Sequence, residues 1–71
     1  MKYRPQRGSL EESMKEVVEI EPPTVGALAK YLNVRAHRLK FKLYAYDERI
    51  DWYTGIVTID GQAVGFTDRL I

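Results

Sequence analysis

The segment of residues 47–51 carries four ionisable side chains, Asp47, Glu48, Arg49 and Asp51. Paired carboxylates can hydrolyse a glycosidic bond when they flank a cleft, but a chain of 71 residues has little room for a cleft. A calcium loop needs alternating oxygen ligands around a central glycine and a closing glutamate, an order that this segment lacks. We therefore interpret the segment as a solvated loop, not as a catalytic or metal site.

The chain has one histidine, His37, and no cysteine. Disulfides, thiolate zinc sites and histidine-rich metal sites are therefore excluded. Nucleophilic catalysis needs a nucleophile beside a base that a third group orients, and nothing in the sequence marks such a set. The glycines are dispersed and form no phosphate-binding motif. We expect a protein that is not an enzyme and that holds no metal or cofactor, with His37 on its surface.

Aromatic side chains gather around the same charged segment. Aromatic residues together with arginine dominate the binding energy of protein interfaces. The leading hypothesis is therefore a protein-interaction surface that consists of Tyr44, Tyr46, Asp47, Arg49, Trp52 and Tyr53. The alternative is that Trp52 fills the small core.

A basic stretch before these aromatics supports a second hypothesis, nucleic-acid binding. It contains Arg35, Arg38, Lys40 and Lys42. Lys40 and Lys42 alternate with the aliphatic residues of a strand and would share one face with Tyr44 and Tyr46. Cations would then follow the phosphates while the rings stack on bases. The net charge of +1 gives little support to a dedicated nucleic-acid binder, and the tyrosines could simply cover the sheet.

Two short helices are expected to position these residues. Ser9 and Glu12 match a capping box, which predicts a helix over about residues 10–16. Thr24 follows two prolines as the next N-cap, and Asn33 can end the second helix. The apolar stripe of that second helix consists of Val25, Leu28, Ala29 and Leu32.

Three strands follow, over residues 39–46, 52–59 and 62–67, where apolar and β-branched residues recur. Asp60-Gly61 predicts a two-residue hairpin turn between the last two strands. This turn would place Ile59 opposite Gln62, Val57 opposite Val64, and Gly55 opposite Phe66. Gly55 would then leave room for the ring of Phe66.

These elements predict an α+β fold with a three- or four-stranded antiparallel sheet and two short helices packed on one face. Residues 17–20 are the optional fourth strand. Residues 1–8 are expected to form an irregular basic arm, because Pro5 and Gly8 oppose regular structure, and residues 9–71 a single α+β domain. The predicted core consists of Leu28, Leu32, Phe41, Leu43, Val57, Ile59, Val64 and Phe66.

The composition, 45% hydrophobic and 30% charged, is typical of a globular protein. No apolar run approaches the roughly 20 residues of a membrane helix, and the basic start lacks the apolar stretch of a signal peptide. We therefore expect a cytoplasmic protein with no membrane association. A homodimer, which would enlarge the small core, is compatible with the sequence.

Four segments are similar to those of small uncharacterised proteins encoded by tailed phages and bacterial prophages. They are Tyr3-Arg4-Pro5-Gln6-Arg7-Gly8-Ser9-Leu10, Asp47-Glu48-Arg49-Ile50-Asp51-Trp52, Ile56-Val57-Thr58 and Gly65-Phe66-Thr67-Asp68. The resemblance covers most of the chain and carries no activity, ligand or catalytic residue with it. It implies a phage-derived accessory protein in the cytoplasm of a bacterial host, acting by binding a host or phage macromolecule.

Overall fold

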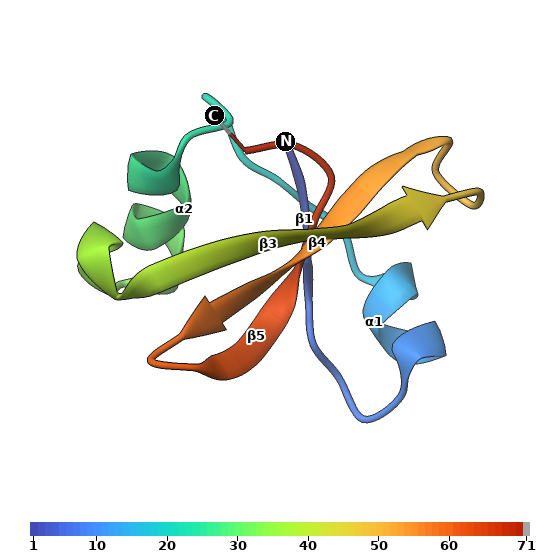
Figure 1. Ribbon diagram of the computed structural model, residues 1–71, viewed down its shortest axis with the longest axis horizontal. Coiled ribbons are helices and arrows are strands. Elements are labelled where there is room, and N and C mark those ends of the chain that lie inside the picture. Colours follow the sequence, from blue (N-terminus) through green and yellow to red (C-terminus); the bar gives the residue numbers. More distant parts are fainter. Residues whose placement is uncertain (71) are drawn as a thin grey trace.

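The computed structural model describes residues 1–70, which form one five-stranded antiparallel sheet and two α-helices (Figure 1). The strand order is β2-β1-β5-β4-β3. The predicted α+β class is confirmed, with five strands in place of three or four. In chain order the elements are β1 (Lys2–Pro5), α1 (Leu10–Lys15), β2 (Val18–Glu19), α2 (Val25–Leu32), the 3₁₀ helix η1 (Ala36–Arg38), β3 (Leu39–Asp47), β4 (Trp52–Ile59) and β5 (Gln62–Thr67).

The N-terminal segment contains β1, so the prediction of an irregular arm over residues 1–8 is wrong. β1 pairs with β2 on one side and with β5 on the other, where Tyr3 faces Thr67 and Arg4 faces Phe66. Pro5 ends the strand, and beyond it the backbone N–H of Gln6 donates to the carbonyl of Val64 at 3.0 Å. Pairing with strands distant in the sequence outweighs the local preference of Pro5 and Gly8.

Both helices begin where their caps predict. The Ser9 hydroxyl accepts a hydrogen bond from the backbone N–H of Glu12, and the Thr24 hydroxyl accepts one from Ala27, each at 3.1 Å. Asn33 ends α2 in the left-handed conformation with φ of 58°. The optional strand after α1 is also present, as the two residues of β2.

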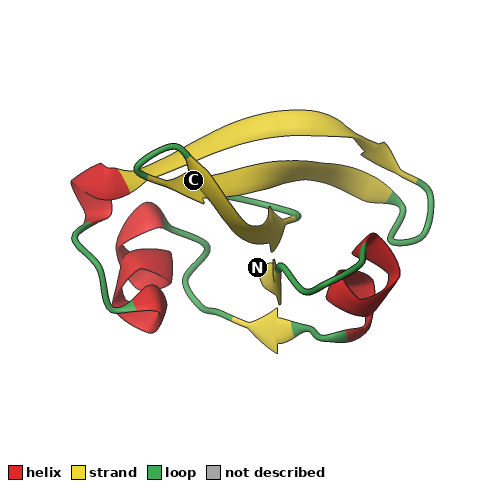
Figure 2. Ribbon diagram, turned by 90° about the horizontal axis from the view of Figure 1, so that it is seen from below, coloured by secondary structure: helices red, strands yellow, loops and turns green. Residues whose placement is uncertain are grey.

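The helices lie on opposite sides of β1, so the prediction that both pack on one face is wrong (Figure 1). Tyr31 of α2 contacts the ring of Tyr3 edge-to-face, with ring centroids 5.9 Å apart. Met14 of α1 instead lines a groove with Arg4. Neighbouring residues of a strand point to opposite faces of the sheet, so each helix covers a different face. In Figure 2 the two longest strands arch across both helices.

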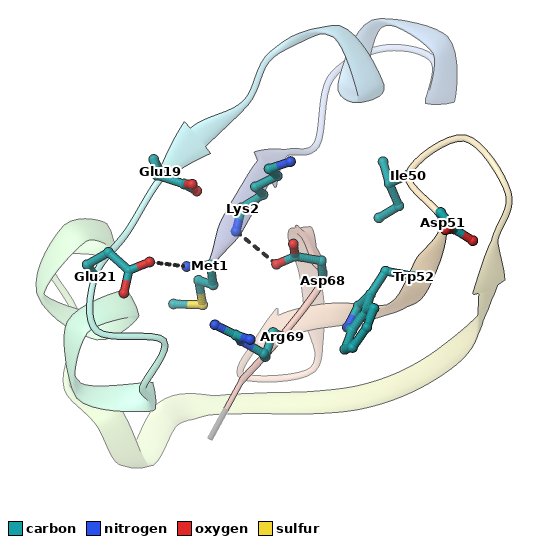
Figure 3. A pocket seen from close by; sticks show the side chains of 9 residues that line it. All are labelled: Met1, Lys2, Glu19, Glu21, Ile50, Asp51, Trp52, Asp68 and Arg69. Atoms are coloured by element: carbon teal, nitrogen blue, oxygen red, sulfur yellow. Dashed lines mark hydrogen bonds and ion pairs between the residues drawn. The ribbon is translucent and has the colours of Figure 1, made fainter.

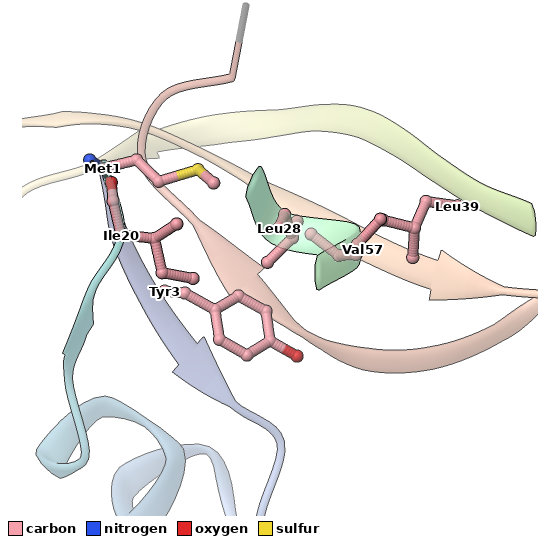
Figure 4. Close-up of a cluster of buried hydrophobic side chains, with 7 residues drawn as sticks. Met1, Tyr3, Ile20, Leu28, Leu39 and Val57 are labelled. Carbon is pink, nitrogen blue, oxygen red and sulfur yellow. Dashed lines mark hydrogen bonds between the residues drawn. The ribbon is translucent and has the colours of Figure 1, made fainter. Parts of the chain in front are cut away.

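The buried apolar core lies between α2 and the sheet (Figure 4) and consists of Met1, Tyr3, Ile20, Leu28, Ala29, Leu39 and Val57. Of the predicted core only Leu28 and Val57 are fully buried. Packed around them and partly buried are Leu32, Phe41, Ile59 and Val64. Leu43 lies on the edge strand β3, with a neighbouring strand on one side only, and is 57% exposed.

A β-bulge changes the predicted pairing of β4 with β5. Ile59 faces Gln62 as predicted, but Val57 faces Gly65 because Val64 is an extra residue on β5. Phe66 therefore faces Ile56 and moves to the sheet face opposite to the one predicted. The space at Gly55 is filled by the ring of Phe41 instead. The turn itself has the expected positive φ angles, 51° at Asp60 and 86° at Gly61.

Gly65 is required because the ring of Tyr3 lies directly against its backbone. The Tyr3 hydroxyl donates a hydrogen bond to the carbonyl of Val64 at 2.8 Å, and burial raises the pKa of Tyr3 to about 12. A Cβ atom at Gly65 would meet that ring and lie 2.7 Å from the carbonyl oxygen of Arg4. A side chain at this position would therefore displace either β1 or the Tyr3 ring.

We expect Gly65→Ala to lower the free energy of unfolding by about 1–3 kcal/mol, the usual effect of overpacking a core. Gly26→Ala is the matched control, because a Cβ there meets no atom within 4 Å. This helical substitution should raise the free energy of unfolding by up to about 1 kcal/mol. Urea denaturation followed by circular dichroism measures both effects, and similar changes in the two variants would contradict the prediction.

Candidate functional site

The β3–β4 hairpin carries all six residues of the predicted interaction surface but divides them between its two faces. Tyr46 faces Tyr53, and Asp47 faces Trp52. Facing residues share a side and neighbouring residues alternate. Tyr46 and Tyr53 therefore point to one face of the hairpin, while Asp47 and Trp52 point to the other. All six residues nevertheless lie at the same end of the hairpin, next to the loop that joins β3 to β4.

The aromatic side chains of this hairpin are exposed. Tyr44 is 71% exposed, Trp52 49% and Tyr53 53%, so the alternative that Trp52 fills the core is wrong. Tyr46 is 47% exposed, and its ring contacts that of Tyr53 edge-to-face with centroids 5.4 Å apart. The Tyr46 hydroxyl donates a hydrogen bond to the Asp51 carboxylate. The aromatic rings are thus held in place at the surface.

Asp47 organises the loop between β3 and β4. One of its carboxylate oxygens accepts from the backbone N–H and the Nε of Arg49, and the other accepts from Nη2, all at 2.9 Å. These bonds hold the pKa of Asp47 below its usual range, and the side-chain hydrogen bond from Arg49 has the largest effect. The charge of Arg4 acts in the same direction. The Asp47 side chain is only 9% exposed. The interpretation as solvated charges therefore fits the exposed Glu48 and Asp51 but is wrong for Asp47.

Two buried polar side chains, Arg4 of β1 and Thr54 of the hairpin itself, were not singled out by the sequence. Arg4 is 4% exposed. Its Nε and Nη1, like the Oγ1 of Thr54, have no hydrogen-bond partner among the described residues. The burial of Arg4 follows from its position in β1. Because the local sequence does not predict this strand, it gives no signal that Arg4 is buried.

Two adjoining grooves separate α1 from the hairpin, and both are lined by Met14 and Arg49. The first, of about 770 Å³, is also lined by Arg4, Glu11, Lys15 and Ile50. The second, of about 360 Å³, is also lined by Tyr44, Ala45, Tyr46, Asp47, Glu48, Thr54 and Phe66. Four of the predicted interaction residues, Tyr44, Tyr46, Asp47 and Arg49, thus line the groove next to that of the buried arginine.

Trp52 borders a separate pocket of about 310 Å³ near the N-terminus (Figure 3). Several charged groups of this pocket are already bonded. The backbone N–H of Lys2 donates to the Asp68 carboxylate at 2.8 Å, and the ammonium of Met1 donates to Glu21 at 3.2 Å. Among the described residues, no group of histidine, cysteine or carboxylate side chains is arranged to hold a metal ion.

The residues of the nucleic-acid hypothesis are exposed, as is His37, but they do not form the predicted face. Lys42 faces Ile56, and a bulge at Tyr44 reverses the alternation, so Tyr46 points to the face opposite Lys42. Arg38 forms an ion pair with Asp60. The hydrogen bonds from the Arg38 guanidinium lower the pKa of Asp60. Arg35 and Lys40 lie outside this pair, on the loop before η1 and on β3.

Comparisons with protein families, with curated proteins and with solved structures give no match. Among residues 1–70, no helix is both long enough and apolar enough to cross a membrane. The function is therefore inferred from the geometry of the chain itself.

Asp47→Asn should destabilise the protein at neutral pH and have little effect in acid. Because Arg49 lowers the pKa of Asp47 in the folded state, the ionised carboxylate contributes stability above the unfolded pKa of about 4. That stability is lost as the pH falls through the lowered pKa. The difference in free energy of unfolding between the wild type and Asp47→Asn, measured in urea from about pH 7 to about pH 2, should shrink accordingly.

Glu48→Gln is the control for this titration, because Glu48 is exposed and forms no ion pair among the described residues. A pH dependence of the same size in both variants would show that the Asp47–Arg49 pair is not its source.

Proposed function

We propose that the protein is a non-enzymatic protein-interaction module whose contact surface is the end of the β3–β4 hairpin. The observation that carries this proposal is the exposure of four aromatic side chains there, each half exposed or nearly so: Tyr44, Tyr46, Trp52 and Tyr53. Aromatic residues bury the largest areas at interfaces and lose few rotamers on binding. Exposed patches of such residues mark interaction sites on soluble proteins.

The hairpin also has the rigidity that favours binding. The β3–β4 ladder runs from Leu39 and Ile59 to Asp47 and Trp52, and the Asp47–Arg49 hydrogen bonds fix its loop. A surface that is already ordered loses less conformational entropy when a partner docks. The edge-to-face pair of Tyr46 and Tyr53 is therefore better suited to specific contact than a mobile tail would be.

The partner that we propose is a protein of a bacterial host or of a phage. The resemblance of the chain to small phage and prophage proteins supports this choice, as does the mixture of exposed rings with the charged Asp51 and Glu48. Base stacking could use the same rings, but Lys42, a cation that would bind phosphates beside Tyr46, points to the opposite face of β3. A protein partner is therefore preferred over nucleic acid.

The triple variant Tyr44→Ser, Trp52→Ser, Tyr53→Ser should lose the partner, because truncation of interface aromatics commonly costs more than about 1 kcal/mol each. Tagged protein is incubated with nuclease-treated bacterial lysate, and enriched proteins are quantified by mass spectrometry. Specific partners should fall about tenfold or more in the triple variant.

Tyr31→Ser is the matched control, since Tyr31 is 48% exposed but lies on α2. Partners retained by Tyr31→Ser and lost by the triple variant support the hairpin as the contact surface. Partners that persist in the triple variant, or a wild-type sample that enriches nothing, would count against the proposal.

A further inference from the structure

The guanidinium of Arg4 is a buried cation whose Nε and Nη1 have no hydrogen-bond partner among the described residues. A charged group taken out of water is costly unless a charge of opposite sign and hydrogen bonds compensate it. Asp47, a hairpin carboxylate on which the charge of Arg4 acts, accepts its hydrogen bonds from Arg49 instead. Arg4 forms no ion pair within residues 1–70, so its charge is compensated only by the attraction of Asp47, which is not bonded to it.

The groove lined by Arg4 has an excess of positive charge. Its lining includes three cationic side chains, those of Arg4, Lys15 and Arg49, against the single carboxylate of Glu11. Arg49 is bonded to Asp47, whereas Lys15 is exposed and forms no ion pair within residues 1–70. Arg4 and Lys15 thus remain available to an anion that enters between α1 and the hairpin.

A carboxylate fits this groove better than a phosphate. The planar guanidinium can pair with either anion through two parallel hydrogen bonds, so the choice between them depends on the rest of the lining. The apolar lining from Met14 and Ile50 suits the methylene groups of an acidic side chain. Met14 is unbranched and can shift to open the buried nitrogens to a ligand.

We propose that this groove binds a carboxylate side chain of the protein partner, with Arg4 as its principal ligand and Lys15 beside it. This inference rests on the proposed function and adds the chemistry of the partner, an acidic segment that also contacts Tyr44 in the adjoining groove. Thr54, whose hydroxyl is buried without a partner, lines the adjoining groove.

The direct test is a titration of the ¹⁵N-labelled full chain with sodium butyrate, observed at the arginine Nε–H signals by NMR. The Arg4 signal should shift and reach saturation, while the signal of the exposed Arg35 should change no more than with sodium chloride at equal ionic strength. Absence of a saturable shift at Arg4 overturns the site. A tighter saturable response to inorganic phosphate overturns the choice of a carboxylate.

Arg4→Met and Arg35→Met provide a second measurement by thermal unfolding. Arg4→Met keeps the volume of the side chain and removes an uncompensated buried charge, so it should melt at the same temperature as the wild type or higher. Butyrate should raise the Tm of the wild type and of Arg35→Met by binding the native state, but not that of Arg4→Met. A Tm increase that survives in Arg4→Met overturns the proposal.

The same lysate experiment separates this inference from the proposed function. Loss of the partner in Arg4→Met, with retention in Arg35→Met, supports a partner carboxylate at Arg4. Partners that depend on the tyrosines and are unaffected by Arg4→Met leave the interaction module standing and overturn the carboxylate contact. Saturable butyrate binding by a protein that enriches no partner supports the anion site and overturns the proposed function.

Discussion

The insertion of β1 between β2 and β5 is the constraint on which the rest of the structure depends. Tyr3 pairs with Val18 on one side and with Thr67 on the other, and it is the largest fully buried side chain. Its neighbour Arg4 is buried toward the opposite face. One short strand thus supplies both the centre of the apolar core under α2 and the unpaired cation beside α1, because successive side chains alternate between the faces of a sheet.

The sequence predicts the local elements well because neighbouring residues determine them. The caps at Ser9 and Thr24 satisfy backbone donors within one turn, and the Asp60-Gly61 turn follows from the backbone angles that glycine allows. The arrangement of these elements depends on contacts between distant residues. Nothing near Pro5 reveals that β5, some sixty residues later, will pair with it, and a single extra residue at Val64 reverses the predicted face of Phe66.

The candidate site likewise has features that the sequence predicts and features that depend on distant contacts. Exposed aromatic residues can be recognised from their type and their proximity to charged residues, and Tyr44 and Trp52 are indeed at the surface. The state of a charged side chain depends on what packs against it. Asp47 and Arg4 differ in no sequence property from the exposed Asp51 and Arg35, yet both are largely buried, because α1 and the hairpin enclose the grooves that they line. Sequence patterns therefore find the exposed aromatic residues but not the buried cation.

The exposure of the aromatic residues of the hairpin points to a role outside the core, because a chain with so small a core would gain stability by burying them. Burial of a large apolar side chain contributes roughly 1.5–3 kcal/mol, and a domain of 71 residues has few other sources of stability. The edge strand β3 also carries a bulge at Tyr44 and the exposed lysines Lys40 and Lys42, features that oppose strand-to-strand pairing with a second copy. A partner that docks against the side chains of the hairpin is compatible with these features, whereas one that extends the sheet at β3 is not.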